Sequence, residues 1–177
     1  FTHKVQHVIG NGKHEVERNF ELVTKQLPLA KLQKPKLYAS ASDVASVTAL
    51  EAERAYVVMA PASVWFTKQL PESKWVELIR LIPADTAIYL IGAPGDKELV
   101  DRILHAASRD NCHNLAGKLS LLASALLMQK ARMNYVNDSA PLHLASAMNA
   151  PVTAYFCSTV PELGFGPLSD QSKIVQV

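Results

Sequence analysis

Three side chains that can do chemistry stand close together in the stretch NDSAPLH, residues 137–143. Asp138 and Ser139 follow an apolar run and precede Pro141, a residue suited to the first turn of a helix. Both are residue types that cap helices, so one interpretation is purely structural. The other is that free backbone N–H groups and the helix dipole form an anion site, over which the imidazole of His143 leans. The residues alone leave both interpretations open.

Two other loops contain residues suited to binding a nucleotide. The stretch APASVWFTKQLPES contains Ser63 and Lys68, and a lysine beside an anion site can neutralise a phosphate, although most such lysines are simply solvated. In the same loop, Trp65 is either a core residue or a wall of the site. In GAPGDKE, Asp96 either stabilises the start of a helix or accepts hydrogen bonds from a ribose, and the residues alone favour the helix.

The elements that must position these loops alternate along the chain. Apolar periodicity predicts helices over residues 15–27, 42–50, 72–82, 96–107, 120–128 and 141–148. Strands are expected over residues 56–59, 87–91, 114–116, 133–136, 152–156 and 173–177. This alternation is typical of a parallel sheet with helices on both faces, and such sheets bind ligands at the carboxyl ends of their strands. Ser42 and Asp43 are expected to cap the second helix.

The composition describes an ordinary globular chain. Its 177 residues suffice for one domain with a sizeable core, and 49% of them are hydrophobic and 19% charged. A formal net charge of +2 gives no sign of a nucleic-acid-binding surface. No apolar run is long enough to span a bilayer. Cys112 and Cys157 have no disulfide or metal-ligand spacing, so we expect a reducing, cytoplasmic location.

Several familiar motifs are absent from the sequence. The Walker pattern GxxxxGK followed by Ser or Thr does not occur, and neither does the GxGxxG fingerprint, which disfavours a nicotinamide dehydrogenase. No GxSxG elbow occurs, which argues against a serine hydrolase built on Ser139 and His143. No group of His, Cys and carboxylate residues has metal-ligand spacing, so we expect no metal site.

Taken together, the strand-end loops resemble one family. The blocks APASVWFTKQLPESKW, YLIGAPGDKELVDRI, NLAGKLSLLASALL, YVNDSAPLHLASAMNAPVTAYF and STVPELGFGPLSDQSKIV occur in the order found in ADP-heptose:lipopolysaccharide heptosyltransferases of glycosyltransferase family nine. The resemblance covers about residues 55–177 well and the first fifty residues loosely. It implies an α/β fold with a Rossmann-like doubly wound parallel sheet, the C-terminal half of a two-domain GT-B glycosyltransferase.

The resemblance implies a nucleotide-sugar-binding domain at residues 51–177, preceded over residues 1–50 by the end of an N-terminal region and an interdomain connection. The whole enzyme would be an inverting heptosyltransferase that builds the lipopolysaccharide core from ADP-heptose and a lipid A–core acceptor, without a metal or other cofactor. It would act at the cytoplasmic face of the inner membrane, with peripheral membrane association. The chain opens on Phe1 rather than Met, so we expect a piece of a longer protein. The catalytic base would lie in the N-terminal domain, so we expect no transfer by this chain alone.

The resemblance also assigns roles to single residues. The donor site would consist of Ser63 and Lys68 at the diphosphate, Asp96 at the ribose, Leu119 near the base, and Asp138, Ser139, the Ala140 backbone and His143 at the phosphate and sugar. Ala140 stands where the family usually has Gly, and its methyl would restrict the backbone near the phosphates and make a positive φ costly. The alternative is a degenerate, non-catalytic module of the same fold that binds a nucleotide or a partner.

Overall fold

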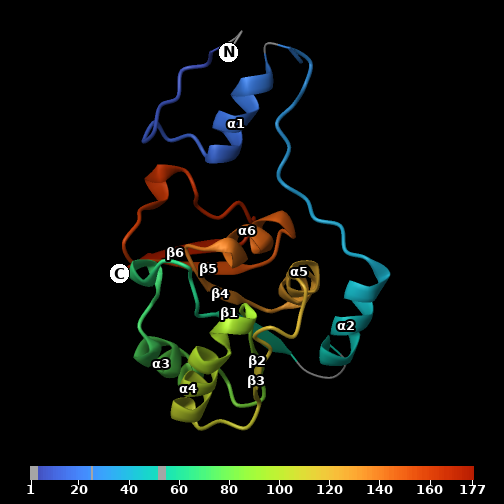
Figure 1. Cartoon of the computed structure of the whole chain (residues 1–177), viewed down its shortest axis with the longest axis vertical. Coiled ribbons are helices and arrows are strands. Elements are labelled where there is room, and N and C mark those ends of the chain that lie inside the picture. Colours follow the sequence, from blue (N-terminus) through green and yellow to red (C-terminus); the bar gives the residue numbers. More distant parts are fainter. Residues whose placement is uncertain (1–3, 25, 52–54) are drawn as a thin grey trace.

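The computed structural model describes residues 4–24, 26–51 and 55–177, and a six-stranded parallel sheet forms its centre (Figure 1). The strand order is β3-β2-β1-β4-β5-β6. The strands are β1 (Tyr56–Ala60), β2 (Ala87–Leu90), β3 (Cys112–Asn114), β4 (Asn134–Asn137), β5 (Val152–Phe156) and β6 (Ser172–Gln176). Five of them match the predicted strands to within about one residue. The third was predicted at residues 114–116 and lies two residues earlier, because Leu115 and Ala116 are the buried start of the next loop.

Helices cover both faces of the sheet, which confirms the predicted α/β class and doubly wound arrangement (Figure 1). The helices are α1 (Glu15–Thr24), α2 (Ala41–Glu51), α3 (Glu72–Leu81), α4 (Lys97–Ala107), α5 (Leu121–Lys130) and α6 (Ala140–Ala147). Short 3-10 turns are η1 (Phe66–Lys68), η2 (Pro94–Asp96) and η3 (Pro161–Leu163). Helices α3 and α4 pack on one face of the sheet, and α2, α5 and α6 lie on the other.

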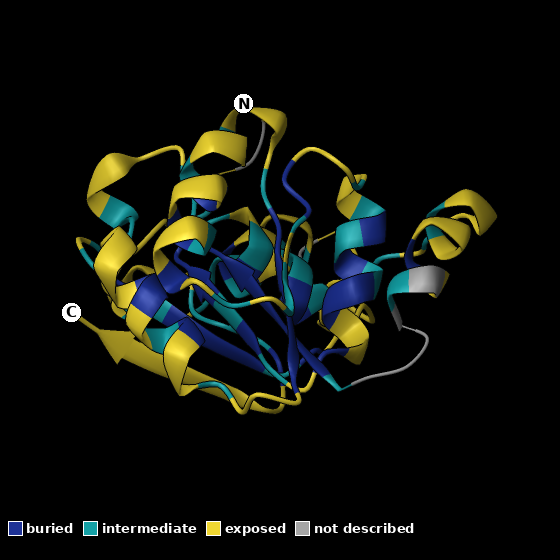
Figure 2. Cartoon of the chain, turned by 90° about the horizontal axis from the view of Figure 1, so that it is seen from below, coloured by how far each residue is buried: buried dark blue, intermediate teal, exposed yellow. Residues whose placement is uncertain are grey.

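The hydrophobic core follows from the alternation of side chains along the central strands. Val57 and Met59 point toward the face that holds Trp75 of α3, whereas Val58 and Ala60 point toward the face covered by α5 and α6. Because both faces are covered, all five residues of β1 are buried, and the central strands form the dark blue centre of Figure 2.

The chain reverses its direction across the sheet between β1 and β4. From β1 the chain proceeds to β2 and β3 on one side, and from β4 it proceeds to β5 and β6 on the other. Parallel sheets of this kind bind ligands in the crevice at the carboxyl ends of the two strands where the order reverses. Here that crevice lies between the loop after β1 and the start of α6, the two segments in which Lys68 and Asp138 were singled out.

The N-terminal helices differ from the sequence prediction in two details. The first helix was expected to continue to residue 27 and ends at Thr24; residue 25 lies outside the described residues. Leu27 is 57% exposed, so burial of an apolar stripe does not extend the helix that far. The second helix is capped by Ser40 rather than Ser42, because the Ser40 N–H donates to Asp43 Oδ2 at 2.9 Å and the Asp43 N–H donates to Ser40 Oγ at 3.2 Å.

Arg109 fastens the loop between α3 and β2. Its guanidinium donates hydrogen bonds of 2.6 to 2.9 Å to the backbone carbonyls of Ile79, Ile82, Pro83 and Thr86. Asn111 Nδ2 also donates to the Ala84 and Thr86 carbonyls, at 2.9 and 2.8 Å, so two side chains together satisfy the carbonyls of the turn.

Replacing Arg109 with alanine is expected to lower the free energy of unfolding by about 3 kcal/mol, because several carbonyls lose a charged donor at once. Urea denaturation followed by circular dichroism measures the change. Arg102→Ala is the matched control, since that arginine makes an exposed ion pair of 2.7 Å with Glu72 and is expected to contribute much less to stability. Equal losses in the two variants would contradict the role given to Arg109.

Candidate functional site

A pocket of about 510 Å³ opens at the carboxyl ends of the strands, at the crevice between β1 and α6. Five of the eight predicted site residues line it: Ser63, Asp96, Leu119, Ser139 and Ala140. They come from four different loops that the sheet brings together. Lys68, Asp138 and His143 are not among the lining residues and form a second group beside Ser139.

The pocket combines apolar surface with polar groups at a helix start. Leu119 and Leu121 contribute apolar side chains near the start of α5, while Ser139 and Ala140 present the start of α6. Apolar walls with a few oriented polar groups are typical of small-molecule sites, and N–H groups at a helix start favour anions. The arrangement suits a ligand with a flat apolar part and a phosphate part.

The start of α6 is not capped by the side chains expected to cap it. Ser139 has an extended backbone, φ −155°, and occupies the capping position, but its hydroxyl accepts no capping hydrogen bond. The hydroxyl instead donates weakly to the Asn137 carbonyl at 3.5 Å. Ala140 begins the helix and does not have a positive φ, so the strain expected from its methyl does not arise. The purely structural interpretation of Asp138 and Ser139 as caps is therefore wrong.

Asp138 instead belongs to a buried polar group at the junction of three loops. Its side chain is 6% exposed, and Oδ2 accepts hydrogen bonds from Lys68 Nζ at 2.7 Å and from Thr159 Oγ1 at 2.6 Å. A buried carboxylate requires such partners. Among the described residues, Asp138 is the only hydrogen-bond partner of the Lys68 ammonium, which leaves two of its three N–H donors for an anion.

His143 lies in the first turn of α6, as predicted, beside this group. Its ring makes an edge-on contact with the Phe165 ring, with 6.3 Å between the centroids. His143 is an exposed residue, but partial loss of hydration around its ring lowers its pKa; Asp138 opposes this shift, and nearby His14 and Lys68 add to it. The fold therefore favours the neutral imidazole.

Stability is expected to fall as the pH drops below about 6.5, the ordinary pKa of a histidine. Because the pKa of His143 is lowered in the folded chain, the unfolded chain binds more protons at this ring in that window, so the free energy of unfolding rises with pH. Urea titrations at a series of pH values measure the slope of the free energy of unfolding against pH. His143→Asn should reduce it, and an unchanged slope in that variant would contradict the assignment.

Asp96 has the structural role considered for it and also lines the pocket. Its Oδ2 accepts a hydrogen bond from the Ala93 N–H at 2.7 Å, which confirms the structural role at a helix start. No described residue bonds to Oδ1, and Asp96 lines the pocket. Gly92 permits this position, because a Cβ there would lie 2.9 Å from Asp96 Oδ2, whereas a Cβ at Gly95 would meet no atom within 4 Å.

Trp65 has neither of the two roles considered for it. Its side chain is 67% exposed, so it is not a core residue, and it is not among the residues that line the pocket. The neighbouring Val64 does line the pocket. The core position expected of a tryptophan is occupied instead by Trp75 of α3.

Sequence reasoning missed the residues that hold the β1 loop in place. Asn137 is fully buried; its Nδ2 donates to the Pro61 carbonyl at 2.8 Å and its Oδ1 accepts from the Leu70 N–H at 3.1 Å. One side chain thus joins the two ends of the loop. Thr159, the partner of Asp138, was also missed, although its position three residues after the end of β5 is the signal that could have found it.

Residues 4–24, 26–51 and 55–177 contain neither a candidate metal site nor a candidate membrane-spanning helix. No three His, Cys, Asp or Glu side chains gather closely enough to hold a metal ion. No helix within these ranges combines the length and apolar character needed to cross a membrane.

Comparison with known sequences identifies the family. The sequence model described as glycosyltransferase family 9 (heptosyltransferase) matches residues 1–177. The chain belongs to glycosyltransferase family 9. This family 9 chain is 31% identical over 135 residues to lipooligosaccharide heptosyltransferase 2 of Haemophilus influenzae, which covers 73% of the chain and 39% of that relative. It is 28% identical over 133 residues to lipopolysaccharide heptosyltransferase 2 of Escherichia coli K12, a match that covers 72% of this chain and 38% of that relative.

Solved structures agree with the family assignment. The E. coli ADP-heptose lipopolysaccharide heptosyltransferase II matches with a TM-score of 0.70 and 25% identity over 82% of this family 9 chain and 46% of that protein. The E. coli heptosyltransferase WaaC, solved with ADP, matches with a TM-score of 0.74 and 28% identity over 99% of this chain and 54% of that protein. The chain thus spans about half the length of these structures, and the predicted fold, half of a GT-B glycosyltransferase, is confirmed.

Proposed function

We propose that this family 9 chain is the donor-binding domain of an inverting heptosyltransferase that builds the lipopolysaccharide core. The observation that supports this most directly is the pocket at the reversal point of the sheet, which joins apolar walls to the start of α6. A related heptosyltransferase with 26% identity and a TM-score of 0.68 was solved with ADP-2-deoxy-2-fluoro heptose. The donor proposed here is ADP-heptose.

The proposed donor extends from the pocket toward the Asp138 group. The base lies near Leu119, and the ribose hydroxyls donate to the available oxygen of Asp96. The diphosphate lies between Ser63 and the start of α6, within reach of Lys68. The sugar then lies on the side of Asp138 and His143, outside the pocket itself.

The chemical contribution of this chain is electrostatic. Transfer breaks the bond between the sugar and the diphosphate, and negative charge grows on the departing phosphate oxygens. We expect the Lys68 ammonium and the N–H groups at the start of α6 to stabilise this charge as it develops. No metal is required in this scheme.

The remaining parts of the reaction belong to residues outside this chain. The chain spans less than two thirds of its relatives, and we assign the lipid A–core acceptor site and the catalytic base to the other half of the whole enzyme. Residues 1–50 then form the connection to that half. We place the enzyme in the cytoplasm, in peripheral contact with the inner membrane.

Calorimetry of the 177-residue chain with ADP and ADP-heptose tests this proposal. We expect weak binding, with a Kd of about 0.1 to 1 mM, and no transfer to acceptor. A folded chain that binds neither ligand at millimolar concentration contradicts the proposal. NAD serves as the control ligand and is expected not to bind, because the dehydrogenase fingerprint is absent.

A degenerate, non-catalytic module is the second candidate, and Ala140 is the residue that suggested it. The unstrained helical position of Ala140 removes one objection to donor binding. Ala140→Gly discriminates between the two candidates: a donor site should bind ADP-heptose at least as tightly in this variant, whereas a degenerate module should remain unable to bind it.

A further inference from the structure

The first turn of α1 is bound to the loop that follows β5, 145 residues further along the chain. The connection centres on Arg18, whose side chain is only 4% exposed. Its guanidinium donates to the Leu163 carbonyl at 2.6 Å, to the Lys13 carbonyl at 2.8 Å and to Glu15 Oε2 at 2.8 Å. A buried arginine is stable only with such a set of partners, so this contact is specific.

Two further hydrogen bonds fasten the same turn to the same loop. The Glu15 N–H donates to the Gly164 carbonyl at 2.8 Å. His14 Nε2 lies 3.0 Å from the Gly166 carbonyl, and His14 Nδ1 accepts from the Val16 N–H at 3.1 Å. Because Nδ1 accepts, Nε2 carries the proton and donates to the loop.

The loop is shaped to receive Arg18. Gly164 has φ +93°, a left-handed conformation that favours glycine. A Cβ at this position would lie 2.5 Å from Arg18 Nη2 and 2.7 Å from the Lys13 carbonyl oxygen. Any other residue at Gly164 would therefore displace the arginine.

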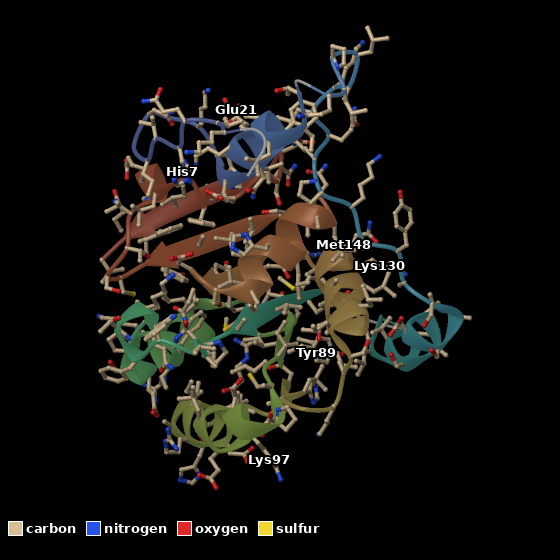
Figure 3. All side chains as sticks on the ribbon, turned by 45° about the horizontal axis from the view of Figure 1, so that its top comes forward. His7, Glu21, Tyr89, Lys97, Lys130 and Met148 are labelled. Carbon is tan, nitrogen blue, oxygen red and sulfur yellow. The ribbon has the colours of Figure 1, made fainter. Side chains whose placement is uncertain are left out.

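The opposite side of this loop contacts the proposed sugar end of the donor site. Phe165 follows Gly164 directly, and its ring packs edge-on against His143. At the start of the loop, Thr159 holds Asp138. The loop thus has α1 on one side and the Asp138 group on the other. In Figure 1 the blue helix α1 lies beside the orange-red segment that follows β5, far from α4 (Glu21 and Lys97 in Figure 3).

We propose that Arg18 is a positioning residue for the sugar end of the donor site: by fixing Leu163 and Gly164, it holds Phe165 against His143. The choice of ligand rests on the proposed function, whereas the contacts that form this connection do not. Arg18 touches no part of the site itself and acts through the loop. The N-terminal segment therefore contributes to the arrangement of a site built at the far end of the chain.

Two variants break the connection from opposite sides. Arg18→Gln removes the guanidinium, and Gly164→Ala keeps Arg18 but introduces the methyl that excludes it. Arg102→Gln is the matched control, an arginine ion pair on the surface of α4. Circular dichroism first establishes that each variant is folded, and NMR then follows the titration of the His143 ring.

In both variants we expect the pKa of His143 to rise toward its ordinary value, because release of Phe165 returns water to the imidazole. ADP-heptose should bind about tenfold more weakly while ADP changes less than about twofold. Arg18→Lys should restore part of both effects. Folded variants that keep the wild-type pKa of His143 overturn the proposal, as do equal losses for ADP and ADP-heptose. If the wild-type chain binds neither ligand, the proposed function fails, and the His143 titration alone decides whether Arg18 positions the loop.

Discussion

Lys68→Ala is expected to weaken the binding of ADP by about 100-fold while leaving the binding of adenosine nearly unchanged, because a charge-assisted contact to a phosphate contributes about 2 to 3 kcal/mol. The two donors that Lys68 does not use on Asp138 are the ones available to the diphosphate. Calorimetry with both ligands measures the difference. Equal losses for adenosine and ADP would contradict the phosphate role.

The controls for Lys68 separate ligand binding from stability. Lys74→Ala removes an exposed lysine paired with Glu77 at 2.9 Å and should change neither affinity. Lys68→Ala also leaves the buried Asp138 carboxylate with Thr159 as its remaining partner, which lowers stability. The double variant Lys68→Ala/Asp138→Asn removes that buried charge. It should recover stability without recovering the affinity for ADP.

The largest loss of stability is expected at Trp75. Its side chain is fully buried between α3 and the sheet, its indole N–H donates to the Leu70 carbonyl at 3.1 Å, and its ring packs edge-on against Tyr155 at 5.5 Å. Trp75→Ala should therefore lower the free energy of unfolding by about 4 kcal/mol, through the cavity and the lost hydrogen bond. Urea denaturation provides the measurement.

Two variants in the same helix calibrate that result. Leu81 is 80% exposed at the end of α3, so Leu81→Ala should cost less than about 0.5 kcal/mol. Trp75→Phe keeps much of the volume but loses the donor to Leu70, so its loss should fall between those of the two alanine variants. A Trp75→Ala loss as small as that of Leu81→Ala would show that the helix does not pack as described.

The central strands could be predicted from the sequence because burial on both faces makes them continuous apolar runs. The edge strand β3 could not be placed as accurately, since none of Cys112, His113 and Asn114 is fully buried and the apolar signal falls on the loop behind them. The end of α1 was also misplaced. The stripe that predicted a longer helix includes Val23, which no neighbouring element covers fully.

The candidate site was predictable as a set of loops but not as a set of contacts. Residues at the ends of parallel strands must meet, so the sequence indicated Ser63, Asp96 and Ser139 correctly as neighbours of one pocket. The pairing of Lys68 with Asp138 spans 70 residues, and no local pattern encodes it. The same holds for Arg18, which looks like an ordinary surface arginine of an amphipathic helix until the loop around Gly164 is seen.

Asn137 fastens both ends of the β1 loop, so much of the sequence between them can be changed. This single amide closes the loop at Pro61 and Leu70, and Lys68 pairs with the buried Asp138, so the other residues in between add little to holding the strand and α3 together. A loop whose ends are fastened in this way accepts changes of length and sequence at a small entropic cost. New ligand specificities could therefore be introduced by exchanging residues 62–67, provided that Asn137 and Lys68 are kept, without redesigning the sheet beneath.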